Sequence, residues 1–227
     1  MRPKHPWPKA MHKLTAAKRH DGYTYRCVVT NSVGSVTSEN ATLTIIGHPA
    51  ITTQPKSLTV NEGSTAKFSV EATGGGLKYH WFYQKPGESE WTAVKVGGDG
   101  ASYTLTTEAR HNGYKYKCRV KNIAGTVYSS VVTLTVNPKP VITTQPTSVT
   151  VNAGEKATFK VAATGATSYQ WYYLKPGETE WRKVSNNGTS AIYTLTTAAR
   201  HNGYKYKCVV TNSAGSVTSS TVKLTVK

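Results

Sequence analysis

Cysteine is scarce in this sequence, with three residues in a chain of 227. The three stand at Cys27, Cys118 and Cys208, nearly the same distance apart. Cysteines at equivalent positions of successive folding units cannot approach within the roughly 7 Å between Cα atoms that a disulfide requires. We therefore expect three free, buried thiols, and cysteine usage does not indicate an oxidising compartment.

Acidic residues are also few, 11 against 28 lysines and arginines, which leaves a net charge of +17. The positive charge is spread along the chain, without a basic tail or dense cluster. A diffuse positive field favours contact with polyanions such as acidic glycans or anionic wall polymers. A solvated surface that keeps a repeat protein soluble is the simpler explanation of the same charge. Nucleic-acid binding is not expected.

Long apolar runs are absent. No stretch reaches the 18 or so apolar residues of a membrane span. The N-terminal stretch also lacks the apolar core of a secretory signal. We expect no membrane-spanning segment, and we expect any signal peptide or anchor to lie outside this chain.

A nine-residue motif, Arg-His-Asn-Gly-Tyr-Lys-Tyr-Lys-Cys, occurs identically at residues 110–118 and 200–208. A variant, Arg-His-Asp-Gly-Tyr-Thr-Tyr-Arg-Cys, occupies residues 19–27. The spacing of about 90 residues between copies is typical of a tandem array of one structural module.

Alignment on this motif divides the chain into four parts. Residues 48–137 and 138–227 are the first and second complete modules, and residues 14–47 are a partial module holding the end of one strand and two further strands. Residues 1–13 match neither complete module. An isolated hairpin is marginal in water, so we expect the partial module to be either poorly ordered or docked against the next one.

Within the motif, tyrosine and cysteine alternate with lysine. This period of two predicts a strand with one buried face and one wet face. Turn signals at short intervals, with nothing helical longer than one turn, predict an all-β chain of tandem β-sandwiches. The expected structural core of the two complete modules comprises Trp81, Tyr116, Cys118, Trp171, Tyr206 and Cys208.

The spacing from Trp81 to the Tyr116-x-Cys118 motif, repeated from Trp171 to Cys208, resembles immunoglobulin-like domains. The family carries a second cysteine on an earlier strand, where this chain has Val70 and Val161. That departure removes a constraint of roughly 3 kcal/mol, and the aromatic core must compensate. The chain is most similar to I-set-like repeats of cell-surface or secreted proteins of anaerobic Gram-positive bacteria.

Candidate catalytic and metal sites are weak. Glu88 and Glu90 form a carboxylate pair on an expected hairpin, but on an open turn they have no reason to act as acid and base. The same holds for Glu178 and Glu180. The histidines of the motif, His20, His111 and His201, occur once per module, too far apart to share a metal. We predict no enzyme, no cofactor and no metal site.

The wet faces of two neighbouring strands in each complete module form a candidate ligand face of aromatic and ammonium groups, a combination suited to carbohydrate or polyanion contact. Alternating lysines could instead merely discourage aggregation. Trp91 and Trp181 are expected to pack across a hairpin rather than join this face. The face comprises Phe82, Lys115 and Lys117 in one module and Tyr172, Lys205 and Lys207 in the other.

The resemblance implies a non-enzymatic repeat array that serves as a spacer or adhesive segment of a cell-surface or secreted protein. One alternative is a binding module for an acidic glycan or wall polymer through the candidate ligand face. A second alternative is an intracellular scaffold array, in which reduced cysteines are normal. We expect an extracellular or cell-surface location, a monomer, and partners drawn from anionic glycans, wall polymers or host surface proteins.

Overall fold

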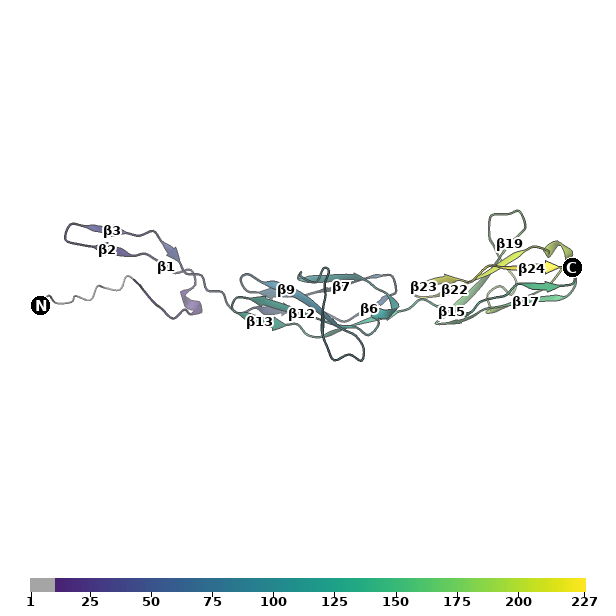
Figure 1. Cartoon of the computed structure of the whole chain (residues 1–227), viewed down its shortest axis with the longest axis horizontal. Coiled ribbons are helices and arrows are strands. Elements are labelled where there is room, and N and C mark those ends of the chain that lie inside the picture. Colours follow the sequence, from purple (N-terminus) through teal and green to yellow (C-terminus); the bar gives the residue numbers. More distant parts are fainter. Residues whose placement is uncertain (1–10) are drawn as a thin grey trace.

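A computed structural model describes residues 11–227 of the chain. The expected leader, residues 1–13, therefore lies mostly outside the described residues. The chain is all-β, and two sandwiches follow one another end to end along the long axis, preceded by a smaller paired segment (Figure 1). The prediction of tandem immunoglobulin-like sandwiches, two complete and one partial, is confirmed.

The first complete module consists of two facing sheets. The larger has the strand order β10-β9-β12-β14-β6, with β13 paired to β12, and the smaller is built from the pairs β11-β7 and β5-β8. Its strands are β5 (Ala50–Thr53), β6 (Leu58–Asn61), β7 (Thr65–Ser69), β8 (Glu71–Thr73), β9 (Lys78–Gln84), β10 (Thr92–Ala93), β11 (Ser102–Thr106), β12 (Lys115–Asn122), β13 (Gly125–Tyr128) and β14 (Val132–Asn137).

The second complete module repeats this topology, with the sheet order β16-β24-β22-β19-β20 and the pairs β17-β21 and β15-β18. Its strands are β15 (Val141–Thr144), β16 (Val149–Val151), β17 (Lys156–Lys160), β18 (Ala162–Thr164), β19 (Ser168–Leu174), β20 (Arg182–Lys183), β21 (Ile192–Thr196), β22 (Lys205–Asn212), β23 (Gly215–Thr218) and β24 (Val222–Val226). Helical structure in the described chain is confined to the three-residue turns η1 (Lys18–His20), η2 (Ala109–His111) and η3 (Ala199–His201).

The first strand of each complete module changes sheets at a proline. In the first module, β5 pairs antiparallel with β8, and after Pro55 the chain continues as β6, which pairs parallel with β14. Proline has no N–H for a strand ladder, so it stands where pairing switches from one sheet to the other. Pro146 stands between β15 and β16 in the same way.

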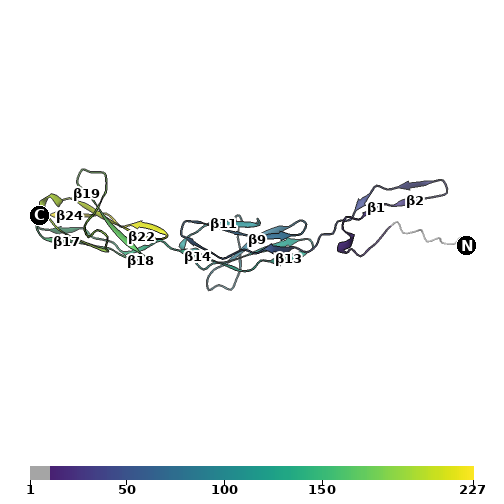
Figure 2. The same cartoon turned by 180° about the vertical axis from the view of Figure 1, so that it is seen from behind.

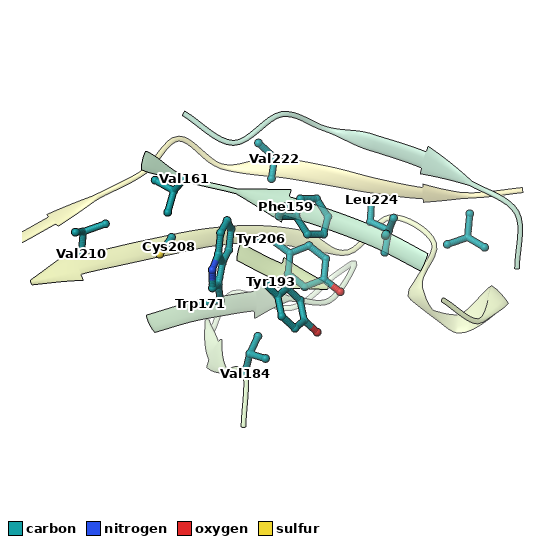
Figure 3. Packing of buried hydrophobic residues seen from close by; sticks show 12 residues of the cluster. Phe159, Val161, Trp171, Val184, Tyr193, Tyr206, Cys208, Val210, Val222 and Leu224 are labelled. Carbon is teal, nitrogen blue, oxygen red and sulfur yellow. The ribbon is translucent and has the colours of Figure 1, made fainter. Parts of the chain in front are cut away.

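Aromatic side chains fill each core. In the second module the ring of Phe159 stacks on Tyr206, with centroids 4.6 Å apart, and the ring of Trp171 lies beside them (Figure 3). The indole N–H of Trp171 donates a hydrogen bond of 2.9 Å to the carbonyl oxygen of Ser190, so its one polar atom is satisfied. Val161 is buried in the same core.

The last strand of each complete module is interrupted. In the first module it is divided into β13 and β14. Between them Ser129 binds the backbone of Cys118: its hydroxyl accepts a hydrogen bond of 2.9 Å from the amide, and its own amide donates one of 2.8 Å to the carbonyl. The serine therefore continues the pairing where the strand ends.

The partial module contains β1 (Thr24–Tyr25), β2 (Val28–Thr30), β3 (Ser35–Thr37) and β4 (Ala41–Thr42), which pair as β1-β4 and β2-β3. It is paired rather than irregular, and it projects away from the first complete module instead of docking on it (Figures 1 and 2). Cys27 is exposed, so the prediction of a buried thiol is wrong there. The reason is that no facing strands cover this hairpin in residues 11–46.

Candidate functional site

The outer face of the large sheet in the first complete module combines basic and aromatic side chains. Strands β9 and β12 run antiparallel, and their register places Lys117 opposite Phe82 and Arg119 opposite His80. Side chains alternate between the two faces of a strand, and the neighbours Tyr116 and Cys118 are buried. Lys117 and Arg119 therefore lie on the outer face.

Lys117 lies between two aromatic rings. Its Nζ is 4.1 Å from the ring centroid of Trp91 and 5.0 Å from that of Tyr128. Trp91 comes from the segment before β10, and Tyr128 ends β13, so three separate segments converge on one ammonium group. Contacts of this kind stabilise a cation over a ring by about 0.5–1 kcal/mol where the site is exposed, and here they fix where the charge is displayed.

A second cation continues the array. The guanidinium carbon of Arg119 lies 5.4 Å from the ring centroid of Phe82, whose ring is 6.5 Å from that of Tyr128. His80 makes an edge contact with Phe82, and its Nδ1 contacts the carboxylate of Asp99. We call this continuous surface the basic aromatic face, and it comprises Phe82, Trp91, Lys115, Lys117, Arg119 and Tyr128.

The corresponding surface of the second module distributes its charge differently. Lys183 on β20 lies opposite Tyr172, and Lys223 on β24 lies opposite Lys205. Lys207 lies opposite Tyr172 across β19 and β22, and its Nζ is 4.3 Å from the ring centroid of Trp181. Lys205 is exposed two residues earlier on the same strand. Val209 occupies the position of Arg119, and Thr218 that of Tyr128.

The structure places the predicted face residues on β9 and β12 and on β19 and β22. Lys115 and Lys205 are exposed at one end, while Phe82, Lys117, Tyr172 and Lys207 are half-buried. The face predicted from the sequence did not include Arg119 or Tyr128. The prediction placed Trp91 and Trp181 in hairpin packing instead of on this face. The period of two along β12 could have indicated Arg119, because it follows Lys115 and Lys117 on the same face.

One carboxylate of each predicted pair forms an ion pair with a basic side chain. Glu88 binds Lys85 at 3.0 Å, and Glu178 lies 3.2 Å from the guanidinium of Arg182. Glu90 and Glu180 are exposed.

Each motif histidine closes a turn. Nδ1 of His111 accepts a hydrogen bond of 3.0 Å from the amide of Glu108, and Nδ1 of His201 accepts one of 3.1 Å from the amide of Ala198. Burial lowers the pKa of both imidazoles from 6.5, and the neighbouring arginine lowers it further. Over residues 11–227, no cluster of three or more His, Cys, Asp or Glu side chains could hold a metal ion.

An open depression lies on the partial module, where strands of a complete sandwich would otherwise cover the hairpin. Its volume is about 960 Å³, and its lining includes Tyr25, Cys27 and Leu43. In residues 11–227 there is no helix of the length and hydropathy that crossing a membrane requires.

Two domain families match the complete modules. An immunoglobulin I-set domain matches residues 49–136, and an immunoglobulin domain matches residues 139–212. Endoglucanase C of Cellulomonas fimi is 32% identical over 79% of this chain and 16% of its own length. Protein sax-3 of Caenorhabditis elegans is 28% identical over 92% of this chain and 17% of its own length.

Among solved structures, the two immunoglobulin domains IG1 and IG2 of DIP-gamma are 20% identical. That match covers 78% of this chain and 97% of the other, with a TM-score of 0.47. The chain spans less than a fifth of the length of the curated relatives it matches.

Proposed function

Because residues 49–136 and 139–212 are domains of the immunoglobulin family, we propose that this chain is a non-enzymatic spacer or adhesive segment of a cell-surface or secreted protein. Its role is to hold other parts of such a protein at a distance from the surface that carries them. A bacterial source is part of the proposal, supported by the match to the Cellulomonas fimi protein and by valine in place of the second cysteine.

The observation that carries this proposal is the joint between the two complete modules. The side-chain amide of Asn61, in the first module, donates a hydrogen bond of 2.7 Å to the carbonyl oxygen of Ser213 in the second. The carboxylate of Glu62 accepts one of 2.9 Å from the amide of Lys139 in the linker. Pro138 and Pro140 further restrict that linker. A short, bonded joint keeps the modules extended, as a spacer requires.

Separate cores support the same role. The buried residues form one cluster in each complete module, so each sandwich folds around its own centre. The stability of such an array is approximately the sum of the stabilities of its modules and of the contacts between neighbours. Endoglucanase C, in which a similar stretch makes up 16% of the protein, is consistent with such a segment serving as an appendage of a larger protein.

Two measurements test the proposal. Antibodies against residues 48–227 should detect the native protein on intact source cells or in the culture medium, and surface proteolysis should remove the signal. Solution X-ray scattering of the chain should give a radius of gyration well above the roughly 17 Å of a compact globule of this length. Recovery of the protein only from the cytosol would favour an intracellular array, and a compact scattering curve would exclude a spacer.

A second candidate function is the binding of an acidic glycan or wall polymer. The observation that favours it is the basic aromatic face, where aromatic rings hold Lys117 and Arg119 in fixed positions above the sheet. Retention of the purified chain on immobilised dextran sulfate at low ionic strength, with release as salt is raised, tests this function. Absence of retention at low salt would dispose of it.

A further inference from the structure

The two complete modules are nearly identical inside and different outside. Every large core side chain of the first has the same residue in the second, including Phe68 and Phe159, and Leu134 and Leu224. The outer face of the large sheet does not follow this rule. Where the first module has Arg119, the second has Val209 at the same register position.

Four further substitutions, on β9, β12 and β13, follow the same direction. Reading from the first module to the second at matched register positions, tyrosine becomes threonine, two lysines become threonine and serine, and histidine becomes glutamine. These pairs are Tyr128 and Thr218, Lys121 and Thr211, Lys78 and Ser168, and His80 and Gln170. On the flanking strands the change is the reverse, because Ala93 becomes Lys183 and Thr133 becomes Lys223. The common lysines of the face, and the tryptophan that contacts one of them, are kept in both modules.

These differences create a row of four cations along one strand in the first module alone. The four cations on the same face of the second module, Lys183, Lys205, Lys207 and Lys223, are spread over three strands. Strand β12 presents four cations at alternate positions, Lys115, Lys117, Arg119 and Lys121, and so displays them along about 20 Å. Strand β22 presents only Lys205 and Lys207 in its corresponding half. A straight row of this length fits an extended polymer with repeated charges better than a single small anion.

The aromatic rings of this row hold cations instead of offering open faces for stacking. Trp91 and Phe82 are half-buried, with Lys117 and Arg119 above their rings. Stacking on open aromatic faces is what single-stranded nucleic acids require of a protein surface. The geometry therefore favours a ligand recognised by its repeated negative charges, as an anionic polysaccharide is.

On this basis, and resting on the second candidate function, we infer that the first complete module contains the polymer-binding site and that the second does not. An extended anionic polysaccharide binds along β12, contacting Lys115, Lys117, Arg119 and Lys121. The second module acts as a spacer that keeps the site at a distance from whatever follows it.

The second module supplies the substitutions that test this inference. In the full chain, the double variant Arg119→Val and Lys121→Thr gives β12 the residues of β22, which the same fold already accommodates. A matched control, Lys56→Thr and Lys67→Thr, removes the same amount of charge from exposed positions of the same module outside the row. It also installs the second module's residues, Thr147 and Thr158.

Affinity for dextran sulfate and for polygalacturonate is measured at several salt concentrations, with single-stranded DNA as a comparison probe. We expect the Arg119→Val and Lys121→Thr variant to lose at least tenfold in affinity and to show a shallower salt dependence, because fewer counterions are released. The Lys56→Thr and Lys67→Thr control should lose less than threefold. The reciprocal variant, Val209→Arg with Thr211→Lys, should raise affinity by adding a second site.

Four results would overturn the inference. Equal losses in variant and control would show diffuse attraction, and a larger loss from Lys205→Thr with Lys207→Thr would place the site in the second module. In both cases the binding function itself would survive. Tighter binding of DNA than of either polysaccharide would reject the ligand class. No binding of any polyanion by the unaltered chain would instead remove the second candidate function together with this inference.

Discussion

Trp81 lies directly opposite Cys118 in the antiparallel ladder between β9 and β12, and both side chains are fully buried. The same relationship joins Trp171 and Cys208. A strand bearing an indole therefore lies beside each of these two buried thiols, and both cysteines are free. Each core depends on packing in place of a covalent link.

Thiol reactivity should separate the three cysteines. Burial raises the pKa of Cys118 and of Cys208 to about 11, so neither forms much thiolate at pH 8. Cys27 is exposed. Titration with a disulfide reagent at pH 8 should count one fast thiol in the native chain and three after unfolding. Two or three fast thiols in the native protein would contradict the described cores.

Removal of a core ring should destabilise one module without affecting the other. Phe68 stacks on Tyr116 at 4.7 Å and lies 6.1 Å from Trp81, so Phe68→Ala leaves a cavity at the centre of the core. We expect a loss of about 3–5 kcal/mol in the unfolding free energy of the first module. Tryptophan fluorescence during urea denaturation should show that module unfolding first.

The matched control is Phe159→Ala, which should move the transition of the second module and leave that of the first in place. A single transition that shifts equally in both variants would mean that the modules unfold as one cooperative unit.

Stability should fall on mild acidification because of two turn histidines. The folded state holds the pKa of His111 and His201 below the ordinary value of 6.5, and each Nδ1 accepts a backbone N–H that protonation would displace. The unfolded chain therefore binds more protons just below pH 6.5. The neutral imidazoles therefore stabilise the folded state fully above pH 6.5. This stabilisation is lost as the pH falls through the lower pKa of the folded state.

Thermal melts between pH 8 and pH 5 measure this effect. The double variant His111→Gln and His201→Gln should show a flatter dependence on pH than the unaltered chain, whose other histidines provide the background. If the melting temperature depends on pH in the same way for both proteins, groups other than these two histidines cause the acid sensitivity.

The joint between the complete modules should loosen when Asn61 loses its amide. Asn61→Ala removes the hydrogen bond to Ser213, a net contribution of about 1 kcal/mol. X-ray scattering should then report a broader distribution of long distances and a smaller mean radius of gyration. Asn152→Ala is the control, because Asn152 occupies the same turn of the second module, next to no further module in this chain. Identical scattering curves for both variants would show that the linker alone determines the angle between the two modules.

Local alternation predicted the inner and outer faces of single strands. The period of two around Tyr116 indicates which side chains are buried, because it depends only on the pleat of a strand. That the strand of Trp81 neighbours the strand of Cys118 was implied by the resemblance to immunoglobulin-like domains. The exposed thiol of Cys27 could not be predicted in this way. A strand pattern specifies an inner face, but burial requires a second sheet, and the partial module has none in the described residues.

The candidate face was predictable only in part, for a related reason. Phe82 and Lys117 belong to adjacent strands, and their alternation suggests a common face. Trp91 lies in a loop and Tyr128 lies on another strand. Their contacts with Lys117 depend on the register between strands. Register depends on where turns and breaks fall, such as the one at Ser129, and no local period reveals it.

The parallel pairing of β6 with β14 determines how a module responds to tension. The pairs run from Leu58 with Leu134 to Asn61 with Asn137, joining the strand near the start of the module to its last strand. A force that stretches the chain by its ends draws these two strands past one another along their length, so their hydrogen bonds bear load together in shear. β16 and β24 repeat the arrangement. In each module the pairing of an early strand with the last strand therefore resists extension of the chain.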